Sequence, residues 1–430
     1  MTATGTVQDH RTSTLGRRRE LIVDVAAPAF VVLYVVLAFK PFELLVAFPG
    51  LATSVVLPAL GVGILAVTPT ERLARVPVSL PLLGSLVWTA LSVLWSDVPS
   101  DTLYTLRSEQ LPLAVLLLVV GTIPPRVAVR TLLVVAVAVT AWSLLVSLVL
   151  PMAREVEAEV GIEAQAGFRG TFGHKNILGV FAVLSLAIVL PMLRGRGRLV
   201  VLGVLVLAAL TTRSATTGGG LMALVFVWLW MVAIERGHSQ RDRRLLLFVS
   251  ISSAVVGLLL VLRLAPVLLE LYDKDVTFSG RTTIWAESMK VVGDRPWLGH
   301  GLAGVWTDPP TALTVELWRH IRFPAAHAHN GVVALLMEVG VVGVALMTVF
   351  VVSVIRLASR VMHLPALRRY GQWGLLITVS LLVMSLAEPL FVNQYLGYLG
   401  IVWSVLASLA NEARAAADRP VVPRRPTTTF

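Results

Sequence analysis

The chain has 430 residues, of which 56% are hydrophobic and 14% are charged, and its mean hydropathy is +0.82. A soluble domain carries about 25% charged residues, so this composition excludes an ordinary soluble protein and indicates a membrane protein. The net charge of +11 does not indicate nucleic-acid binding, because the basic residues lie mostly in short loops, where they contact anionic membrane lipids. The absence of cysteine excludes disulfides, thiol catalysis and cysteine-ligated metals.

Repeated apolar runs predict an all-α, polytopic membrane helical bundle, because lipid leaves every backbone polar group to be satisfied within a helix. The first run follows Arg17-Arg18-Arg19 and shows no clear cleavage site, so we expect it to remain as a span. The runs predict about 12 transmembrane helices: 21–39, 51–67, 78–95, 104–121, 126–150, 174–193, 198–212, 218–234, 245–263, 329–354, 372–391 and 394–411.

Polar segments divide the chain into five parts. Residues 1–16 and 412–430 are polar and lack apolar periodicity, so we expect disordered cytoplasmic tails. Between them, 17–263 holds the first nine helices and 329–411 the last three, separated by a large external loop with short helices over 264–328.

Loop charge predicts the orientation. Basic residues recur in every second loop, on the side of the N-terminus: Arg72 and Arg75, Arg126 and Arg130, Arg194 to Arg198, Glu235 to Arg244, and Arg356 to Arg369. The positive-inside rule therefore places both termini in the cytoplasm and the loop 264–328 outside.

Arg281 is the first candidate site residue, at the start of a short amphipathic helix predicted after Ser279-Gly280. A guanidinium there can bind a diphosphate through two parallel hydrogen bonds. The alternative is an arginine that contacts lipid headgroups or a loop carboxylate such as Asp273 or Asp275.

His327 and His329 flank Ala328, just before Asn330, where the long loop enters span ten. A neutral imidazole can remove a proton from a sugar hydroxyl, and an amide can orient the substrate, although an interfacial histidine is often only a tolerated polar residue. On a continuous helix Gly340 and Gly343 would share a stripe with His329, with Glu338 opposite, so we expect a neighbouring helix to approach below the histidine.

Further cationic and amide donors lie at the outer mouth of span six, where Arg169, Lys175 and Asn176 accompany His174. They suit a phosphorylated lipid, or else are snorkelling side chains at a helix entry. Arg213, in the outer turn 211–217, is a candidate second phosphate ligand; the alternative is a turn whose hydroxyls satisfy helix ends.

Other polar groups carry weaker signals. Glu388 and Asn393 lie between the last two spans, and the outer carboxylates and histidines show no recognised metal-ligand spacing. We therefore expect no metal and no other cofactor, with arginine and lysine neutralising the phosphates.

The chain resembles the O-antigen ligase and polysaccharide polymerase superfamily of integral membrane glycosyltransferases, the WaaL, Wzy and ExoQ type. The resemblance rests on three segments: Arg169 to Gly179, Ser279-Gly280-Arg281 with Trp285 and Pro296 to Gly301, and His329-Asn330 followed after nine residues by Gly340-x-x-Gly343. Within it, Arg213 departs from the family pattern, because it precedes Ser214 where the family has arginine after serine.

The resemblance implies a GT-C-like enzyme in the bacterial cytoplasmic (inner) membrane, with its active site facing outside. It would transfer a glycan from a polyprenyl-diphosphate carrier to a hydroxyl of a lipid, glycan or protein acceptor, with inversion and without metal. His329 would be the general base and Arg281 would bind the diphosphate.

Two alternatives stay open. The first is a polymerase that joins lipid-linked repeats, which the sequence does not distinguish from a ligase. The second is a transporter or flippase for the same lipid-linked sugar. A transporter predicts charged residues along a path through the spans, whereas polarity here gathers on one face.

Overall fold

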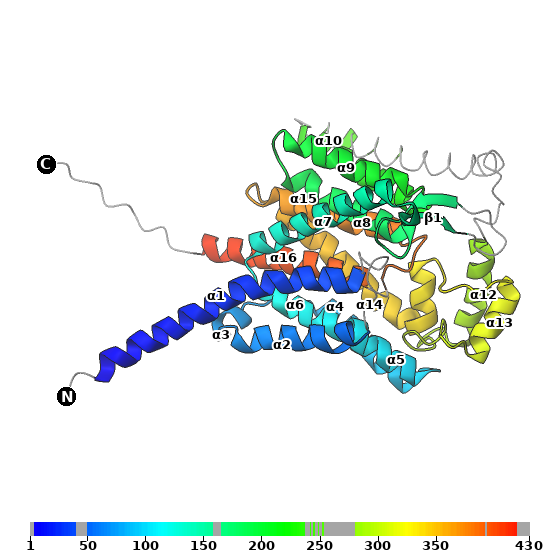
Figure 1. Cartoon of the computed structure of the whole chain (residues 1–430), viewed down its shortest axis with the longest axis horizontal. Coiled ribbons are helices and arrows are strands. Elements are labelled where there is room, and N and C mark those ends of the chain that lie inside the picture. Colours follow the sequence, from blue (N-terminus) through cyan, green and yellow to red (C-terminus); the bar gives the residue numbers. More distant parts are fainter. Residues whose placement is uncertain are drawn as a thin grey trace.

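The computed structural model describes residues 4–39, 50–157, 165–236, 280–391 and 394–418, with isolated helical positions between 241 and 252. The described residues form a helical bundle with one small hairpin (Figure 1). Its helices are α1 (Thr4–Phe39), α2 (Leu57–Val67), α3 (Thr70–Leu73), α4 (Leu80–Leu91), α5 (Pro99–Thr105), α6 (Leu111–Thr122), α7 (Pro125–Val149), α8 (Lys175–Met192), α9 (Gly197–Thr211), α10 (Ala215–Arg236), α12 (Arg281–Asp294), α13 (Ala312–Ile321), α14 (Gly331–Met362), α15 (Arg368–Met384) and α16 (Gln394–Ala417). The hairpin pairs β1 (Arg154–Glu157) with β2 (Gln165–Phe168) in antiparallel register.

Seven described helical stretches are long and apolar enough to cross a membrane, which confirms a polytopic membrane bundle. Three shorter apolar stretches, Ala52–Val67, Leu80–Leu94 and Gly197–Thr211, coincide with three further predicted spans. Helix α15 overlaps the predicted span 372–391 but begins at Arg368 and ends at Met384, before the end of the predicted span. The predicted span 245–263 lies almost wholly outside the described residues, so the count of about 12 stays a prediction.

Three local features differ from the expectation. Helix α1 begins at Thr4, within the predicted disordered tail, because the apolar span nucleates a helix that continues towards the N-terminus. Helix α16 likewise runs on to Ala417 before the described chain ends at Asp418. The hairpin forms between the predicted spans 126–150 and 174–193, where no strand was predicted, and ladder pairs such as Arg154 with Phe168 satisfy its backbone.

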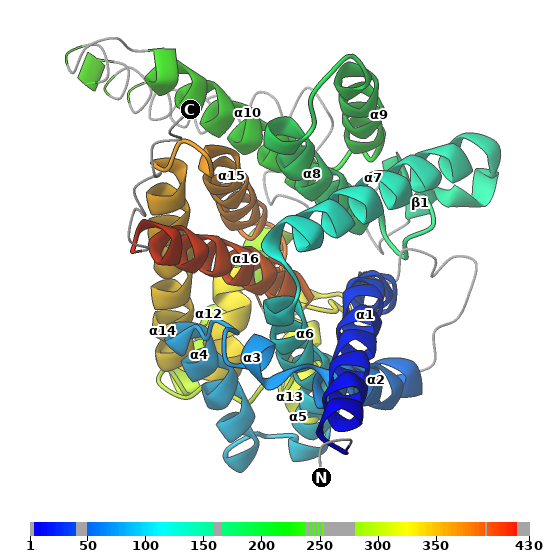
Figure 2. The same ribbon diagram turned by 90° about the vertical axis from the view of Figure 1, so that its left-hand side faces the viewer.

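The two ends of the bundle carry different elements. Figure 1 shows the start of α1 and the end of α16 at one end, and α12 with α13 at the other. In Figure 2, α7 to α10 and α15 form one group, α1 to α6 and α14 form a second, and α16 crosses between them. Helix α16 packs on α6, α7, α14 and α15. The largest fully buried side chains, such as Trp373, Phe350 and Leu116, lie in this core.

Helix α14 is interrupted at Gly340, whose φ of 67° and ψ of −172° are open to glycine but not to other residues. The segment 296–301 enters the break, and a Cβ at Gly340 would overlap the Trp297 carbonyl group. Hydrogen bonds satisfy the freed backbone groups: Val341 N–H to Pro296 O (2.9 Å), His300 N–H to Met337 O (2.8 Å), Gly301 N–H to Glu338 O (2.8 Å) and Trp88 Nε1–H to Val339 O (3.0 Å).

This break corrects the expected role of the two glycines. Helix α14 begins at Gly331, so His329 precedes the helix and the helical phase that aligned it with Gly340 and Gly343 does not apply. Gly340 admits a loop rather than a helix. At Gly343 a neighbouring helix does approach, through Trp88 of α4.

Candidate active site

The start of α12 places Arg281 at the end of the bundle where the histidine segment lies. Gly280 precedes the helix with φ of +79°, and Ser279 lies outside the described residues. Arg281 and Trp285 are one turn apart and therefore share a face. Trp285 Nε1–H donates to the Ala328 carbonyl at 3.0 Å, and Arg281 Nη2 lies 3.4 Å from Glu388 Oε1. Helix α12 thus contacts both the histidine segment and the carboxylate behind it.

Two contacts fix the histidine segment 327–330. His329 adopts φ of +48°, a left-handed conformation that costs a non-glycine residue about 1–3 kcal/mol and recurs at functional sites. Asn330 is the N-cap of α14: its Oδ1 accepts from the N–H groups of Val332 and Val333, and its Nδ2 donates to Leu386 O at 3.3 Å. Asn330, predicted to bind substrate, therefore uses its described hydrogen bonds to hold the segment against the α15–α16 connection.

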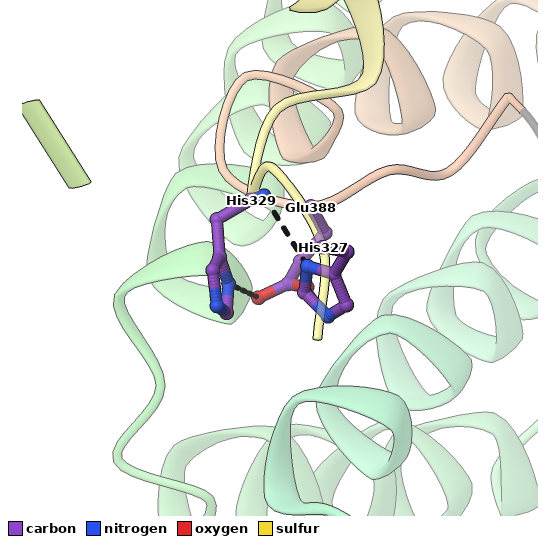
Figure 3. A group of neighbouring side chains, drawn as sticks. All are labelled: His327, His329 and Glu388. Carbon is purple, nitrogen blue, oxygen red and sulfur yellow. Dashed lines mark hydrogen bonds and ion pairs between the residues drawn. The ribbon is translucent and has the colours of Figure 1, made fainter. Parts of the chain in front are cut away.

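Glu388 is the residue on which the site converges, and its side chain is only 10% exposed. Asn176 Nδ2–H donates to Oε1 at 2.7 Å, and Arg281 contacts the same oxygen. His329 Nδ1 lies 3.8 Å from Oε1 and His327 Nε2 lies 4.0 Å from Oε2. Figure 3 shows the carboxylate directed at both imidazoles. One buried carboxylate thus joins the start of α8, the start of α12 and the histidine segment.

The surroundings keep this carboxylate ionised. Burial alone would raise the pKa of Glu388, but the neighbouring imidazole of His329, together with His327 and the Arg281 guanidinium, outweighs it and lowers that pKa. Burial, reinforced by His329 and opposed by the Glu388 charge, lowers the pKa of His327 to about 4. At neutral pH the group therefore combines an anionic Glu388, a cationic Arg281 and a neutral His327.

Hydrogen bonding assigns the His327 tautomer. The backbone N–H of His329 donates to His327 Nδ1 at 3.2 Å, so the His327 proton lies on Nε2, facing Glu388. The two rings are 4.1 Å apart between centroids. His329 Nδ1 is buried without a hydrogen-bond partner in the described part of the chain, and at 3.8 Å its contact with Glu388 is electrostatic.

Helix α8 begins with two predicted site residues, Lys175 and Asn176. His174 is the N-cap, with its Nδ1 accepting from Asn176 N–H at 3.0 Å. Lys175 is buried, and Gly167 of β2 leaves room between the Lys175 side chain and the Thr212 carbonyl. Lys175 and Asn176 therefore both lie at the start of α8, at the end of the bundle where Asn176 contacts Glu388.

Two predicted arginines are not brought to Glu388 by any described contact. Arg169 donates from Nη1 to Gly173 O at 3.3 Å and from Nη2 to Met152 O at 3.2 Å, so it fastens the loop after β2. Arg213 is exposed at the turn between α9 and α10 with φ of +49°. Asn393, the weaker candidate beside Glu388, lies outside the described residues.

His327, His329 and Glu388 also form a group of three donors whose ligand atoms lie within 4.8 Å of one another. Two imidazoles and a carboxylate suit a divalent transition metal by donor type. Arg281 and Asn176 already donate to the same carboxylate, and a dication would face the guanidinium at close range. The surroundings therefore fit an anionic ligand better than a metal ion.

The sequence did not predict that Glu388 is central to the site. It is a single acidic residue between two apolar runs, 212 positions from Asn176 and 107 from Arg281, so no local spacing connects these residues. The available signal was its place at the predicted outer face, where an acid that is costly to bury requires a partner.

Comparisons with known proteins agree with this picture. Residues 198–348 match the family model described as O-antigen ligase (Wzy_C), a region that includes Arg213, Arg281 and both histidines. Over 329 residues the chain is 23% identical to the exopolysaccharide production protein ExoQ of Rhizobium meliloti (strain 1021), covering 73% of this chain and 74% of that protein. Residues 198–348 are thus similar to the O-antigen ligase (Wzy_C) family, and most of the chain is similar, at low identity, to ExoQ.

Proposed function

We propose that this chain is an inverting membrane glycosyltransferase that transfers a glycan from a polyprenyl-diphosphate carrier to an acceptor hydroxyl. The single observation that carries the proposal is the buried Glu388 carboxylate, which contacts Arg281 and Asn176 and faces both histidines. Placed at the end of the bundle opposite the termini, this group would act on the outer face of the bacterial cytoplasmic membrane.

His329 is the general base in this proposal. Glu388 faces Nδ1 and favours the tautomer with the proton there, which leaves the Nε2 lone pair for the acceptor hydroxyl. His327 is a poor base, because its Nδ1 already accepts a hydrogen bond and its Nε2 proton faces the carboxylate. Glu388 and His327 are therefore positioning residues.

The bond changes follow from these roles. The acceptor oxygen attacks the anomeric carbon from the face opposite the diphosphate, while His329 takes the hydroxyl proton. The glycosyl C–O bond breaks, and its electron pair stays on the diphosphate. Arg281 contacts Glu388 through Nη2, and its other N–H groups can donate to the departing phosphates, whose charge grows as the bond breaks. Buried Lys175 adds a second cation near the same end.

The identity of the acceptor distinguishes two forms of the proposed reaction, that of a ligase and that of a polymerase. The match to the O-antigen ligase model favours transfer to a different lipid, glycan or protein. The similarity to a protein named for exopolysaccharide production favours a polymerase that uses a second lipid-linked repeat as acceptor. A flippase for the same lipid is the alternative from another class; the one-sided cluster of polar residues counts against it.

The test is a transfer assay with purified full-length protein in proteoliposomes, supplied with a polyprenyl-diphosphate oligosaccharide, a panel of acceptors and EDTA. We expect release of the carrier diphosphate coupled to product formation, with long products for a polymerase and single additions for a ligase. Arg281→Lys keeps the charge but loses the paired donors, so we expect a rate loss of at least about tenfold. Movement of lipid between leaflets without product would contradict the proposal.

A further inference from the structure

A groove opens on the surface of the bundle between the start of α4, the second half of α14, and α16. Its volume is about 620 Å³, and Pro81, Val349, Val352 and Trp403 are among its lining residues. Thr348 and Ser353 also line it, but their hydroxyls donate to the carbonyls of Val344 and Phe350 within α14. The body of the groove is therefore effectively apolar.

Arg356 and Arg360 line one end of this groove. They are four residues apart on α14, so both guanidinium groups project from the same helical face. Both side chains are exposed, and within the described ranges no carboxylate pairs with either of them. Two uncompensated positive charges thus stand at the end of an apolar channel.

Helix α4 adds to this positive end. Gly84 faces Leu346, and Trp88 bonds to Val339, so residue numbers rise along α4 as they fall along α14 and the two helices are antiparallel. The N-terminus of α4, capped by Ser79, therefore points towards the level of Arg356. The partial positive charge of a helix N-terminus favours an anion there.

Depth in the membrane identifies the kind of ligand. Beyond the break at Gly340, α14 continues without interruption from Val341 to Met362, and Arg356 and Arg360 lie in its last two turns, directly before the basic connection 363–369 that loop charge places on the cytoplasmic side. The two arginines consequently lie at headgroup level on the face opposite the histidine site, with the groove running back into the hydrocarbon layer.

We infer that this groove binds an anionic phospholipid, with one acyl chain along α14 and the headgroup phosphate between Arg356, Arg360 and the start of α4. Charge complementarity and the apolar lining select this occupant over a zwitterionic lipid, which carries its own cation, and over free phosphate, which has no chain to fill the groove. The inference does not depend on the proposed catalytic function.

Native mass spectrometry of the purified full-length protein, titrated with phosphatidylglycerol, phosphatidylcholine or inorganic phosphate, tests this site. We expect preferential retention of phosphatidylglycerol and a loss of affinity of at least tenfold in the double variant Arg356→Gln/Arg360→Gln. The matched control is Arg126→Gln/Arg130→Gln, an exposed pair with the same spacing on α7 that does not line the groove and is expected to retain the lipid.

A third variant separates the groove from bulk charge. Val349→Trp places a large side chain at a position that is 55% exposed and lines the groove, without changing charge, and we expect it to weaken phosphatidylglycerol binding. Three outcomes would overturn the inference: equal losses in the two arginine pairs, no preference over phosphatidylcholine, or undiminished binding by Val349→Trp. Equal binding of inorganic phosphate would show a headgroup contact without a lipid site and would also overturn it.

Discussion

Glu388 is the residue whose charge organises the proposed site. A carboxylate that is 10% exposed needs partners, and Asn176 and Arg281 supply them from different helices. Its loss would leave Arg281 without its described carboxylate partner and His329 without the group that orients Nδ1. Glu388 therefore couples the binding of the diphosphate to the orientation of the base.

We expect Glu388→Gln to lower the transfer rate by at least about tenfold, because the amide keeps the shape of the side chain but not the charge that orients His329. Steady-state transfer kinetics provide the measurement, with Glu316→Gln, an exposed carboxylate on α13, as the matched control. Equal rates in both variants would show that the Glu388 charge has no part in transfer.

The lowered pKa of His327 predicts how stability depends on pH. An unfolded histidine takes up a proton near its ordinary pKa of 6.5, whereas folded His327 resists protonation until about pH 4. Protons therefore favour unfolding in this window, and stability falls as the pH drops through it. The His327 side chain is 35% exposed, so solvent screening weakens the effect.

Thermal unfolding between pH 4 and 7 measures this dependence. We expect the stability of His327→Gln to depend less steeply on pH than that of wild type between the pKa of folded His327, about 4, and the ordinary histidine pKa of 6.5. The lowered pKa of Glu388 acts in the same direction, but only below the ordinary carboxyl value of 4.5. An unchanged slope in His327→Gln above that value would contradict the assignment.

At the scale of elements, the break in α14 joins the end of the helix that follows the histidine segment to the segment 296–301. Its hydrogen bonds depend on the glycine-only conformation of Gly340. Since α12 leads directly into that segment, the break also anchors the helix that carries Arg281. The Gly340-x-x-Gly343 pattern is thus explained by backbone geometry at Gly340 and by the approach of Trp88 at Gly343.

We expect Gly340→Ala to destabilise the protein by at least about 2 kcal/mol, because a Cβ is strained in this conformation and overlaps the Trp297 carbonyl. Gly203→Ala in α9 is the control: it lies in a regular helix with no atom near the added Cβ, and alanine there is expected to stabilise by about 0.5–1 kcal/mol. The melting temperatures of the two variants measure this difference. Equal melting temperatures would show that the glycine-only conformation at Gly340 does not stabilise the fold.

Much of the fold could be predicted from sequence, because membrane helices are long apolar runs bounded by charge. The predicted span 126–150 matches Pro125–Val149, and 174–193 matches Lys175–Met192. The break at Gly340 could not be predicted, since a glycine and the single acid Glu338 are both tolerated within a long apolar helix and neither marks an interruption. In the site, local motifs pointed to Arg281 and His329, but the link through Glu388 depends on tertiary packing that no spacing encodes.

At the scale of the whole molecule, the start of α1 and the end of α16 lie at the end of the bundle opposite α12 and α13 (Figure 1). Loop charge predicts that the first end is cytoplasmic. Since the chain has no cysteine, single cysteines can report sidedness without background.

We expect Lys290→Cys, at a position on α12 that is 70% exposed, to react with an impermeant maleimide in intact spheroplasts. Glu412→Cys, exposed near the end of α16, should react only after permeabilisation. The reverse labelling would place the proposed active site in the cytoplasm and contradict the predicted orientation.

The rate of carrier-diphosphate release coupled to glycan transfer, measured with EDTA in proteoliposomes, tests the central claim most directly. For His329→Gln we predict a rate 10²–10⁴-fold below wild type, the usual contribution of a general base, and for His327→Gln a smaller loss. Retention of the wild-type rate by folded His329→Gln protein would contradict the account.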